Sequence, residues 1–130
     1  MNYSTDNTRI IDKVDLVTPN DVISKYPLTD EISKLVYGTR NEVSQILHGK
    51  DDRLIAVVGP CSIHDPDSAE EYAKLLIDEK KKYEEDILLI MRVYFEKPRT
   101  SIGWKGLIND PDMDNTFDAN KGLFLARSIL

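Results

Sequence analysis

Cysteine is nearly missing from the sequence: Cys61 is the single one, so no disulfide bond can form within the chain. This scarcity favours a reducing, cytoplasmic setting. Uninterrupted apolar runs are also short. The longest, Leu54–Val58 and Ile87–Met91, fall far below the ~18 residues needed to cross a bilayer, so no membrane partner is expected. Residues 1–6 lack the basic and apolar parts of a secretory signal.

Basic charge is in short supply as well. The 130 residues contain 17 Lys and Arg against 23 Asp and Glu, which gives a net charge of −6. Binding to DNA or RNA requires many phosphates to be neutralised, so no nucleic-acid partner is expected. The hydrophobic fraction of 41 % and the charged fraction of 31 % are typical of a folded globular protein, and the length allows one domain.

Against this acidic background, four cations gather in the fourteen positions from Arg92 to Lys105, with Lys97 and Arg99 between them. Such a concentration indicates a focused anion site. Arginine offers a planar fork for carboxylate or phosphate, and lysine offers a mobile point charge. The alternative, a solvated loop whose cations pair with nearby acids, is equally compatible with the pattern.

Cap and stop residues predict the secondary structure of the first part of the chain. Residues 1–17 are polar and are expected to form an extended arm, with a short strand as a further option. A short helix is predicted between Thr18 and Pro27, and a longer one from Thr29 to about His48.

Two buried parallel strands are predicted next, Leu54–Val58 and Ile87 to about Tyr94, joined by a helix that starts at Asp65. The segment from Phe95 to Asn115 shows no period and is expected to be a long functional loop. A last helix should start near Thr116 or Asp118. Two strands leave open sheet edges, so we expect the front portion of a larger α/β protein; a small domain completed by partner chains is the alternative.

Cys61 follows the first strand and Arg92 ends the second, so both are predicted at the carboxyl end of the sheet, where parallel α/β folds bind ligands. Cys61 is compatible with a metal ligand, a nucleophile or a core filler. A hydrolase that uses Cys61 and His64 as a nucleophilic pair is a further hypothesis. The sequence shows no group that would orient the histidine and no substrate-binding or oxyanion arrangement for it.

Two features of the long loop are ambiguous. The alternating Asp110, Asp112 and Asp114 lack the glycine and glutamate of an EF-hand, so turn capping and solvation are favoured over calcium. Trp104 is expected either to close over a ligand or to anchor the loop by packing.

Three stretches, Gly59–Asp65, Met91–Thr100 and Gly103–Pro111, closely resemble the class I 3-deoxy-7-phosphoheptulonate (DAHP) synthases. The resemblance covers essentially the whole chain and corresponds to about the first third of such an enzyme, whose (β/α)₈ barrel needs about 250 residues. It implies an α/β fold in which residues 1–50 form an N-terminal arm and helical extension. Residues 51–130 then form the first two βα units of the barrel, which is incomplete in this chain.

The resemblance also implies a transferase of the shikimate pathway. The family condenses phosphoenolpyruvate with erythrose 4-phosphate and releases phosphate, with a divalent metal such as Mn²⁺ or Fe²⁺. By the same resemblance Cys61 matches a metal ligand, and Arg92 and Lys97 match residues at the phosphoenolpyruvate site. Arg99 and Thr100 match residues that hold the phosphate of erythrose 4-phosphate.

The family's remaining metal ligands and phosphate binders correspond to positions beyond Leu130, so the chain alone is expected to be inactive. Residues 1–17 resemble a segment that serves subunit contacts in a homo-oligomer and feedback inhibition by an aromatic amino acid. The alternative function is a noncatalytic phosphate-binding or subunit-interaction module.

Overall fold

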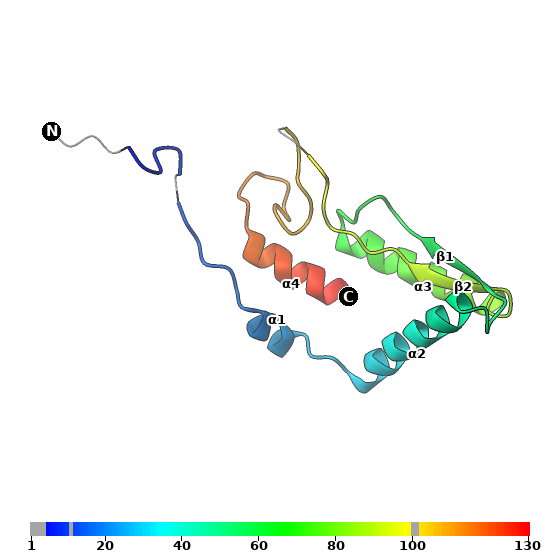
Figure 1. Cartoon of the computed structure of the whole chain (residues 1–130). Helices are drawn as coiled ribbons and strands as arrows, with labels where there is room; N and C mark the ends of the chain where they lie inside the picture. Colours follow the sequence, from blue (N-terminus) through cyan, green and yellow to red (C-terminus); the bar gives the residue numbers. More distant parts are fainter. Residues whose placement is uncertain (1–4, 11, 100–101) are drawn as a thin grey trace.

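The computed structural model describes residues 5–10, 12–99 and 102–130. No helix in these residues is long and apolar enough to cross a membrane. In chain order the elements are α1 (Pro19–Lys25), α2 (Asp30–Leu47), β1 (Leu54–Val58), α3 (Pro66–Lys82), β2 (Ile87–Met91) and α4 (Ala119–Ile129) (Figure 1).

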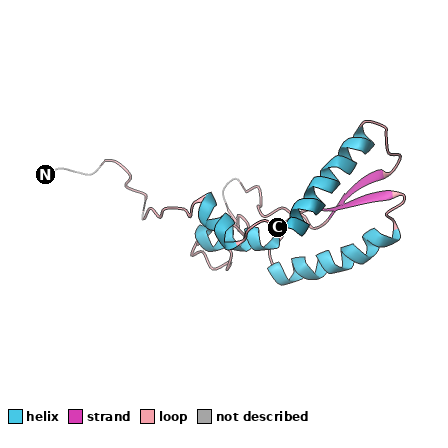
Figure 2. Cartoon of the chain, turned by 90° about the horizontal axis from the view of Figure 1, so that it is seen from below, coloured by secondary structure: helices cyan, strands magenta, loops and turns pink. Residues whose placement is uncertain are grey.

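β1 and β2 are parallel, with Leu54 opposite Ile87 and Val58 opposite Met91. α3 is the crossover between them, and Figure 2 shows the strands lying between α3 and α2. Within the described residues the sheet has two strands and does not close on itself. The α/β class and the strand–helix order match the prediction, whereas the barrel stays a prediction.

Each predicted helix start is confirmed by a side-chain cap. Thr18 and Asp21 form a reciprocal capping box at the start of α1, and Thr29 caps α2. Asp65 caps α3 and Asp118 caps α4. Because these side chains satisfy backbone N–H groups that have no partner inside the helix, the starts are fixed by local chemistry.

β2 is shorter than predicted: it ends at Met91 and not at Tyr94. The reason is its partner, because β1 ends at Val58 and the Gly59–Pro60 turn leads the chain away. The two segments still touch beyond that point. The Arg92 amide donates to the Val58 carbonyl at 2.7 Å, and the Ile63 amide donates to the Tyr94 carbonyl at 2.7 Å.

The segment after β2 is folded back on itself, in contrast to the structureless loop expected from its sequence. Glu96 and Gly106 form an antiparallel bridge. Flanking bonds join the Lys97 amide to the Lys105 carbonyl at 2.8 Å and the Leu107 amide to the Phe95 carbonyl at 2.9 Å. We call residues 95–99 and 102–107 the cationic hairpin.

The main core cluster lies where the cationic hairpin, α3 and the turn after β1 meet. Ile63, Ala69 and Leu107 are buried, and four half-buried apolar side chains pack against them: Val93, Phe95, Trp104 and Ile129. The hairpin is therefore held by burial of its own apolar side chains. At the far side of the sheet, Leu54 and Val57 remain 70 % and 59 % exposed, which leaves an apolar edge open.

The N-terminal arm contains no strand over its described residues. It is not extended throughout, because residues 6–9 form bends and a turn in which the Ile10 amide donates to the Asn7 carbonyl at 3.0 Å. Figure 1 shows it leading away from the body of the molecule. Residues 1–4 and 11 of the predicted arm lie outside the described residues.

Candidate functional site

Arg92 connects the end of β2 with the turn that follows β1. Its Nη1 donates to the carbonyl oxygens of Pro60 at 2.9 Å and Cys61 at 2.7 Å. The guanidinium also lies over the Tyr94 ring, 5.2 Å from its centroid, as in a cation–π contact. The prediction that Cys61 and Arg92 share one end of the sheet is confirmed.

Gly59 permits this close approach. A Cβ atom at Gly59 would lie 2.8 Å from the Arg92 carbonyl oxygen, and the residue has a φ of +152°, which L side chains rarely adopt. Glycine is therefore the residue that lets the turn pass against the backbone of Arg92. The sequence contained this signal in its Gly-Pro pair directly after an apolar run.

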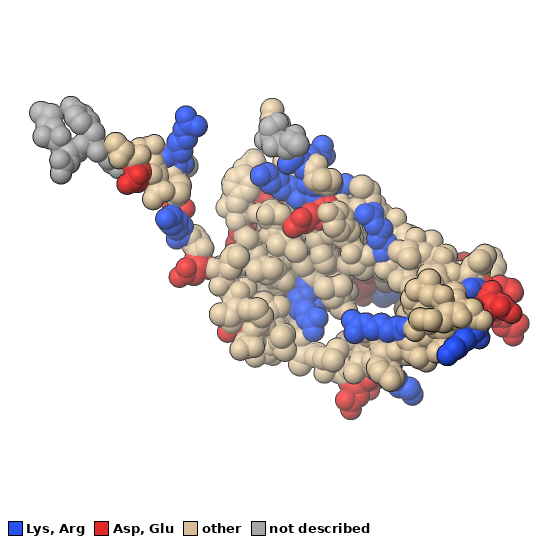
Figure 3. Space-filling model, viewed as in Figure 1, with Lys and Arg blue, Asp and Glu red and all other residues tan. Residues whose placement is uncertain are grey.

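The other cations project from the cationic hairpin, and Figure 3 shows basic side chains gathered over it. The Arg99 Nε lies 3.5 Å from the position that a Cβ of Gly103 would occupy, so the arginine stem crosses the glycine. None of the ion pairs among the described residues involves Arg92, Lys97, Arg99 or Lys105. This argues against the alternative of a loop neutralised by its own acids. Thr100 lies outside the described residues.

Trp104 anchors the hairpin. Its indole Nε1 donates to the Asp110 carbonyl at 2.6 Å, and its ring packs on the core cluster. Of the two roles left open by the sequence, packing is the one that the contacts support. A tryptophan with its N–H satisfied is a rigid support, so it fixes the base of the hairpin from which Lys97 and Arg99 extend.

Asp110 is a residue whose role the sequence did not reveal. It is 3 % exposed; its Oδ2 accepts from the Asn115 amide at 3.2 Å, while Oδ1 is buried without a partner among the described residues. The predicted solvation is therefore wrong for this carboxylate. Asp112 and Asp114 fit the prediction, since they bond Lys121 and the Thr116 amide.

Cys61 is exposed and carries a free thiol. Within residues 5–10, 12–99 and 102–130, no group of three or more His, Cys, Asp or Glu side chains is placed to hold a metal ion. A structural zinc site, for comparison, takes four ligands, so this part of the chain does not fit a metal by itself. No hydrogen bond recorded between described residues joins Cys61 to His64, so the hydrolase hypothesis gains no support.

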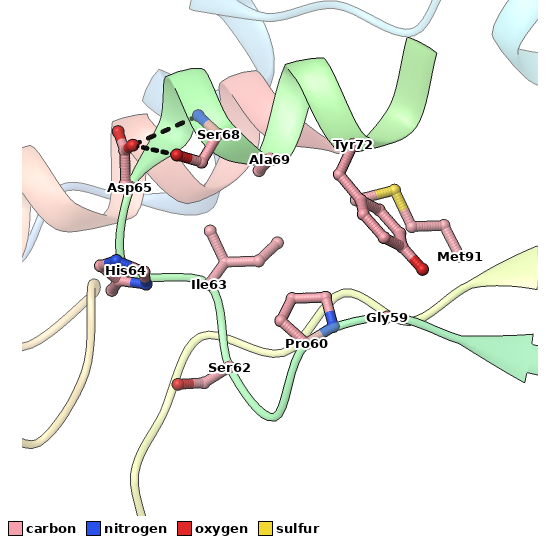
Figure 4. Close-up of a pocket in the computed structure, with 10 residues that line it drawn as sticks. All are labelled: Gly59, Pro60, Ser62, Ile63, His64, Asp65, Ser68, Ala69, Tyr72 and Met91. Carbon is pink, nitrogen blue, oxygen red and sulfur yellow. Dashed lines mark hydrogen bonds between the residues drawn. The ribbon is translucent and has the colours of Figure 1, made fainter. Parts of the chain in front are cut away.

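A hollow of about 400 Å³ lies between the turn after β1 and the start of α3. Figure 4 shows its largely apolar wall, in which Ile63, Tyr72 and Met91 take part. On its rim, the hydroxyl of Ser68 donates to Asp65 and holds the pKa of that carboxyl below its usual range. None of the four cations lines this hollow, so it is separate from the predicted anion site.

Comparison with known proteins agrees with this arrangement. The model of the DAHP synthetase I family matches residues 25–127. The Phe-sensitive phospho-2-dehydro-3-deoxyheptonate aldolase of Escherichia coli K12 is 48 % identical over 130 residues, covering 100 % of this chain and 37 % of the relative. A phospho-2-dehydro-3-deoxyheptonate aldolase of Haemophilus influenzae is 52 % identical over 128 residues, covering 98 % of this chain and 35 % of the relative.

A solved structure gives the same result at the level of the fold. The phospho-2-dehydro-3-deoxyheptonate aldolase of Francisella tularensis superposes with a TM-score of 0.88 at 53 % identity, covering 92 % of this chain and 35 % of that one. The chain thus spans little more than a third of the length of these relatives. Since the family model matches most of its residues, the chain belongs to the DAHP synthetase I family.

Proposed function

We propose that this chain supplies the phosphate-binding edge of a DAHP synthase active site. The reaction is the condensation of phosphoenolpyruvate with erythrose 4-phosphate to 3-deoxy-D-arabino-heptulosonate 7-phosphate, with release of phosphate. The observation that supports the proposal is the hydrogen bond from Arg92 to the Cys61 carbonyl, because it places Arg92 and the residue that carries the thiol at one end of the sheet. The names of the relatives support the same reaction class.

Electrostatics explains why the cations are needed. Both substrates are anions, and two unit charges 4 Å apart interact by about 4 kcal/mol at the effective dielectric of a protein surface. Arg92 and Lys97 are assigned to phosphoenolpyruvate, and Arg99 and Thr100 to the phosphate of erythrose 4-phosphate. Arg92, Lys97 and Arg99 form no ion pairs with the described acids, so binding an anion breaks no such pair.

Cys61 is assigned as one donor to a divalent metal such as Mn²⁺ or Fe²⁺. When bound, such a metal acts as a Lewis acid toward a carbonyl oxygen. The described residues do not complete its ligand set. The role of the chain's own residues is to bind two anions and to orient them toward each other.

The architecture follows the same proposal. Residues 1–50 are an arm and helical extension, and residues 51–130 are the first two βα units of a (β/α)₈ barrel, completed in the homo-oligomeric enzyme by further strands. Relatives are named Phe-sensitive, Trp-sensitive and phenylalanine-inhibited, so we assign to the arm a part in inhibition by an aromatic amino acid. Deletion of residues 2–12 from a full-length version should relieve that inhibition; unchanged inhibition would contradict this role.

The direct test measures phosphoenolpyruvate binding to the 130-residue chain by ³¹P NMR titration. Arg92→Ala should weaken binding about tenfold or more, because a charge-assisted hydrogen bond is lost. Arg40→Ala is the matched control, since Arg40 is an exposed arginine on α2. Equal affinities for both variants would overturn the assignment.

Turnover separates the enzyme from its alternative. The chain alone should convert neither substrate even with manganese, because its described residues bring together no group of three or more potential metal ligands. Product formation by the purified 130-residue chain would contradict this expectation. Phosphate binding by a full-length version that never forms product would favour the noncatalytic phosphate-binding module.

A further inference from the structure

The first turn of α4 touches the N-terminal arm. The side-chain amide of Asn120 makes two bonds to the arm's backbone: its Oδ1 accepts from the Val17 amide at 2.8 Å, and its Nδ2 donates to the Asp15 carbonyl at 3.0 Å. Both bonds span more than 100 residues of sequence. An amide that pairs with an N–H and a C=O two residues apart holds an extended segment in register, much as a neighbouring strand does.

The same face of α4 holds the segment that follows the arm. Phe124 lies under the Lys25 ammonium, 4.4 Å from the ring centroid, and Arg127 Nη2 donates to the Tyr26 carbonyl at 3.5 Å. Positions 120, 124 and 127 follow helical spacing, so they form one stripe. Figure 1 shows α1 beside α4, as this stripe requires.

Lys121 and Gly122, which follow Asn120 in α4, contact a different segment, the loop between the cationic hairpin and α4. Lys121 Nζ lies 2.6 Å and 2.7 Å from the two carboxylate oxygens of Asp112. Gly122 packs directly on the backbone of Ile108, where an added Cβ would lie 2.1 Å from the carbonyl oxygen. Successive helical residues point about 100° apart, so three neighbours can serve two different segments.

From this loop the contacts continue into the hairpin. Asp110 lies between Ile108 and Asp112 in the chain, and its carbonyl accepts the Trp104 indole N–H at 2.6 Å. Gly106 pairs with Glu96 across the hairpin. The half-exposed Lys121–Asp112 pair is a weak link, whereas the Gly122–Ile108 backbone contact is so close that it leaves no room for a side chain at position 122.

We propose that the turn Asn120–Lys121–Gly122 is a junction through which docking of the arm restrains the loop around Trp104, and with it the cationic hairpin. The inference goes beyond the proposed function, because it concerns a coupling inside the chain that requires no substrate. The arm then acts as a strap whose attachment stiffens the base of the anion site.

The test compares Asn120→Ala with Asn41→Ala by hydrogen exchange and NMR on the full 130-residue chain. Asn41 is an exposed asparagine in the interior of α2, so Asn41→Ala makes the same chemical change in a helix away from the arm. The sequence has one tryptophan, so the Trp104 indole N–H gives a single signal. Asn120→Ala should speed exchange of the Val17 amide about fivefold and of the Trp104 indole at least about twofold.

Asn41→Ala should change neither rate. Equal acceleration by both variants would mean general destabilisation and would overturn the proposal. Acceleration at Val17 with no change at Trp104 would show an arm that docks without restraining the hairpin, which also contradicts it.

Deletion of residues 2–17 is the second change in a double-mutant cycle with Asn120→Ala. The deletion alone should speed Trp104 exchange as much as Asn120→Ala does. Adding Asn120→Ala to the shortened chain should then have no further effect, because Asp15 and Val17, which Asn120 contacts, have been removed. A further acceleration would show that Asn120 acts within α4 and not through the arm, and would refute the coupling.

Discussion

The Nη1 of Arg92 lies 2.7 Å from the carbonyl oxygen of Cys61, so the end of the second strand holds the turn that follows the first. The same nitrogen donates to Pro60 at 2.9 Å. Two consecutive carbonyls are thus oriented by one guanidinium. The arginine assigned to bind substrate is also the residue that fixes the position of the candidate metal ligand.

Replacing Arg92 with methionine keeps an unbranched apolar stem but removes the guanidinium and both of its hydrogen bonds. Because these carbonyls are accessible to water, the free energy of unfolding should fall by about 1 kcal/mol. Urea denaturation followed by Trp104 fluorescence measures the change. Arg40→Met, at an exposed position on α2, should cost nothing measurable. A loss above about 3 kcal/mol would mean that Arg92 has a structural role beyond these two bonds.

Replacing a glycine with alanine should change the free energy of unfolding in opposite directions at two positions. Gly106 has a φ of +124°, and a Cβ there would lie 2.1 Å from the Phe95 carbonyl oxygen, so Gly106→Ala should lower the free energy of unfolding by more than about 2 kcal/mol. Gly38 lies inside α2 with no atom within 4 Å of its Cβ position, so Gly38→Ala should raise it by about 1 kcal/mol. Thermal unfolding of both variants checks the signs, and a stabilising Gly106→Ala would contradict the hairpin pairing.

The contribution of Trp104 to the free energy of unfolding should depend on its indole N–H. Trp104→Phe keeps an aromatic ring against the core but leaves the Asp110 carbonyl without its donor, so the free energy of unfolding should fall by about 1–3 kcal/mol. Unfolding is followed by circular dichroism, because the only tryptophan is removed. Tyr37→Phe, at a side chain that is 78 % exposed, is the control and should be neutral. An unchanged Trp104→Phe variant would show that the bond does not anchor the hairpin.

Asp65 should make the start of α3 sensitive to acid. The Ser68 hydroxyl is the main cause that lowers the pKa of Asp65, and the Asp67 and Ser68 amides add to it. A carboxylate whose pKa is lowered by folding stabilises the folded state above its unfolded pKa. That contribution disappears as the pH falls through the folded value.

Backbone exchange in the first turn of α3, measured as a function of pH, tests this. Protection should decline only below the usual aspartate range. Asp65→Asn keeps a good N-cap but cannot titrate, so it should remove the pH dependence while leaving the helix formed. An identical pH profile in wild type and Asp65→Asn would exclude Asp65 as the group responsible.

Local chemistry made much of the fold predictable. Thr18, Thr29 and Asp65 start helices because each cap satisfies backbone donors within its own few residues. The two apolar runs form parallel strands, as their continuous hydrophobicity predicted. The predicted burial on both faces is wrong for β1, where Leu54 and Val57 are 70 % and 59 % exposed, because the sheet has only two strands among the described residues. Cys61 and Arg92 met as predicted, since each follows its strand directly.

The parts that sequence could not predict depend on distant partners. The end of β2 depends on where β1 turns away at Gly59. The cationic hairpin depends on the glycine conformation of Gly106 and on the core beneath Trp104. Asp110 reads as a solvated turn residue because Asn-Asp-Pro is a turn sequence; its burial results from tertiary packing. The contact of Asn120 with the arm joins segments 103 and 105 residues apart and has no local signal.

The proximity of a bound phosphate to the lone thiol tests the central proposal most directly. Cys61 is exposed and is the only cysteine, so a nitroxide can be attached there alone, and its effect on the ³¹P relaxation of phosphoenolpyruvate can be measured. The control places the label on Lys50→Cys in a Cys61→Ser background, at the amino end of β1. The label at Cys61 should enhance phosphorus relaxation severalfold more than the label at position 50. An equal or stronger effect from position 50 would contradict the assignment of the anion site to the end of the sheet that Arg92 and Cys61 share.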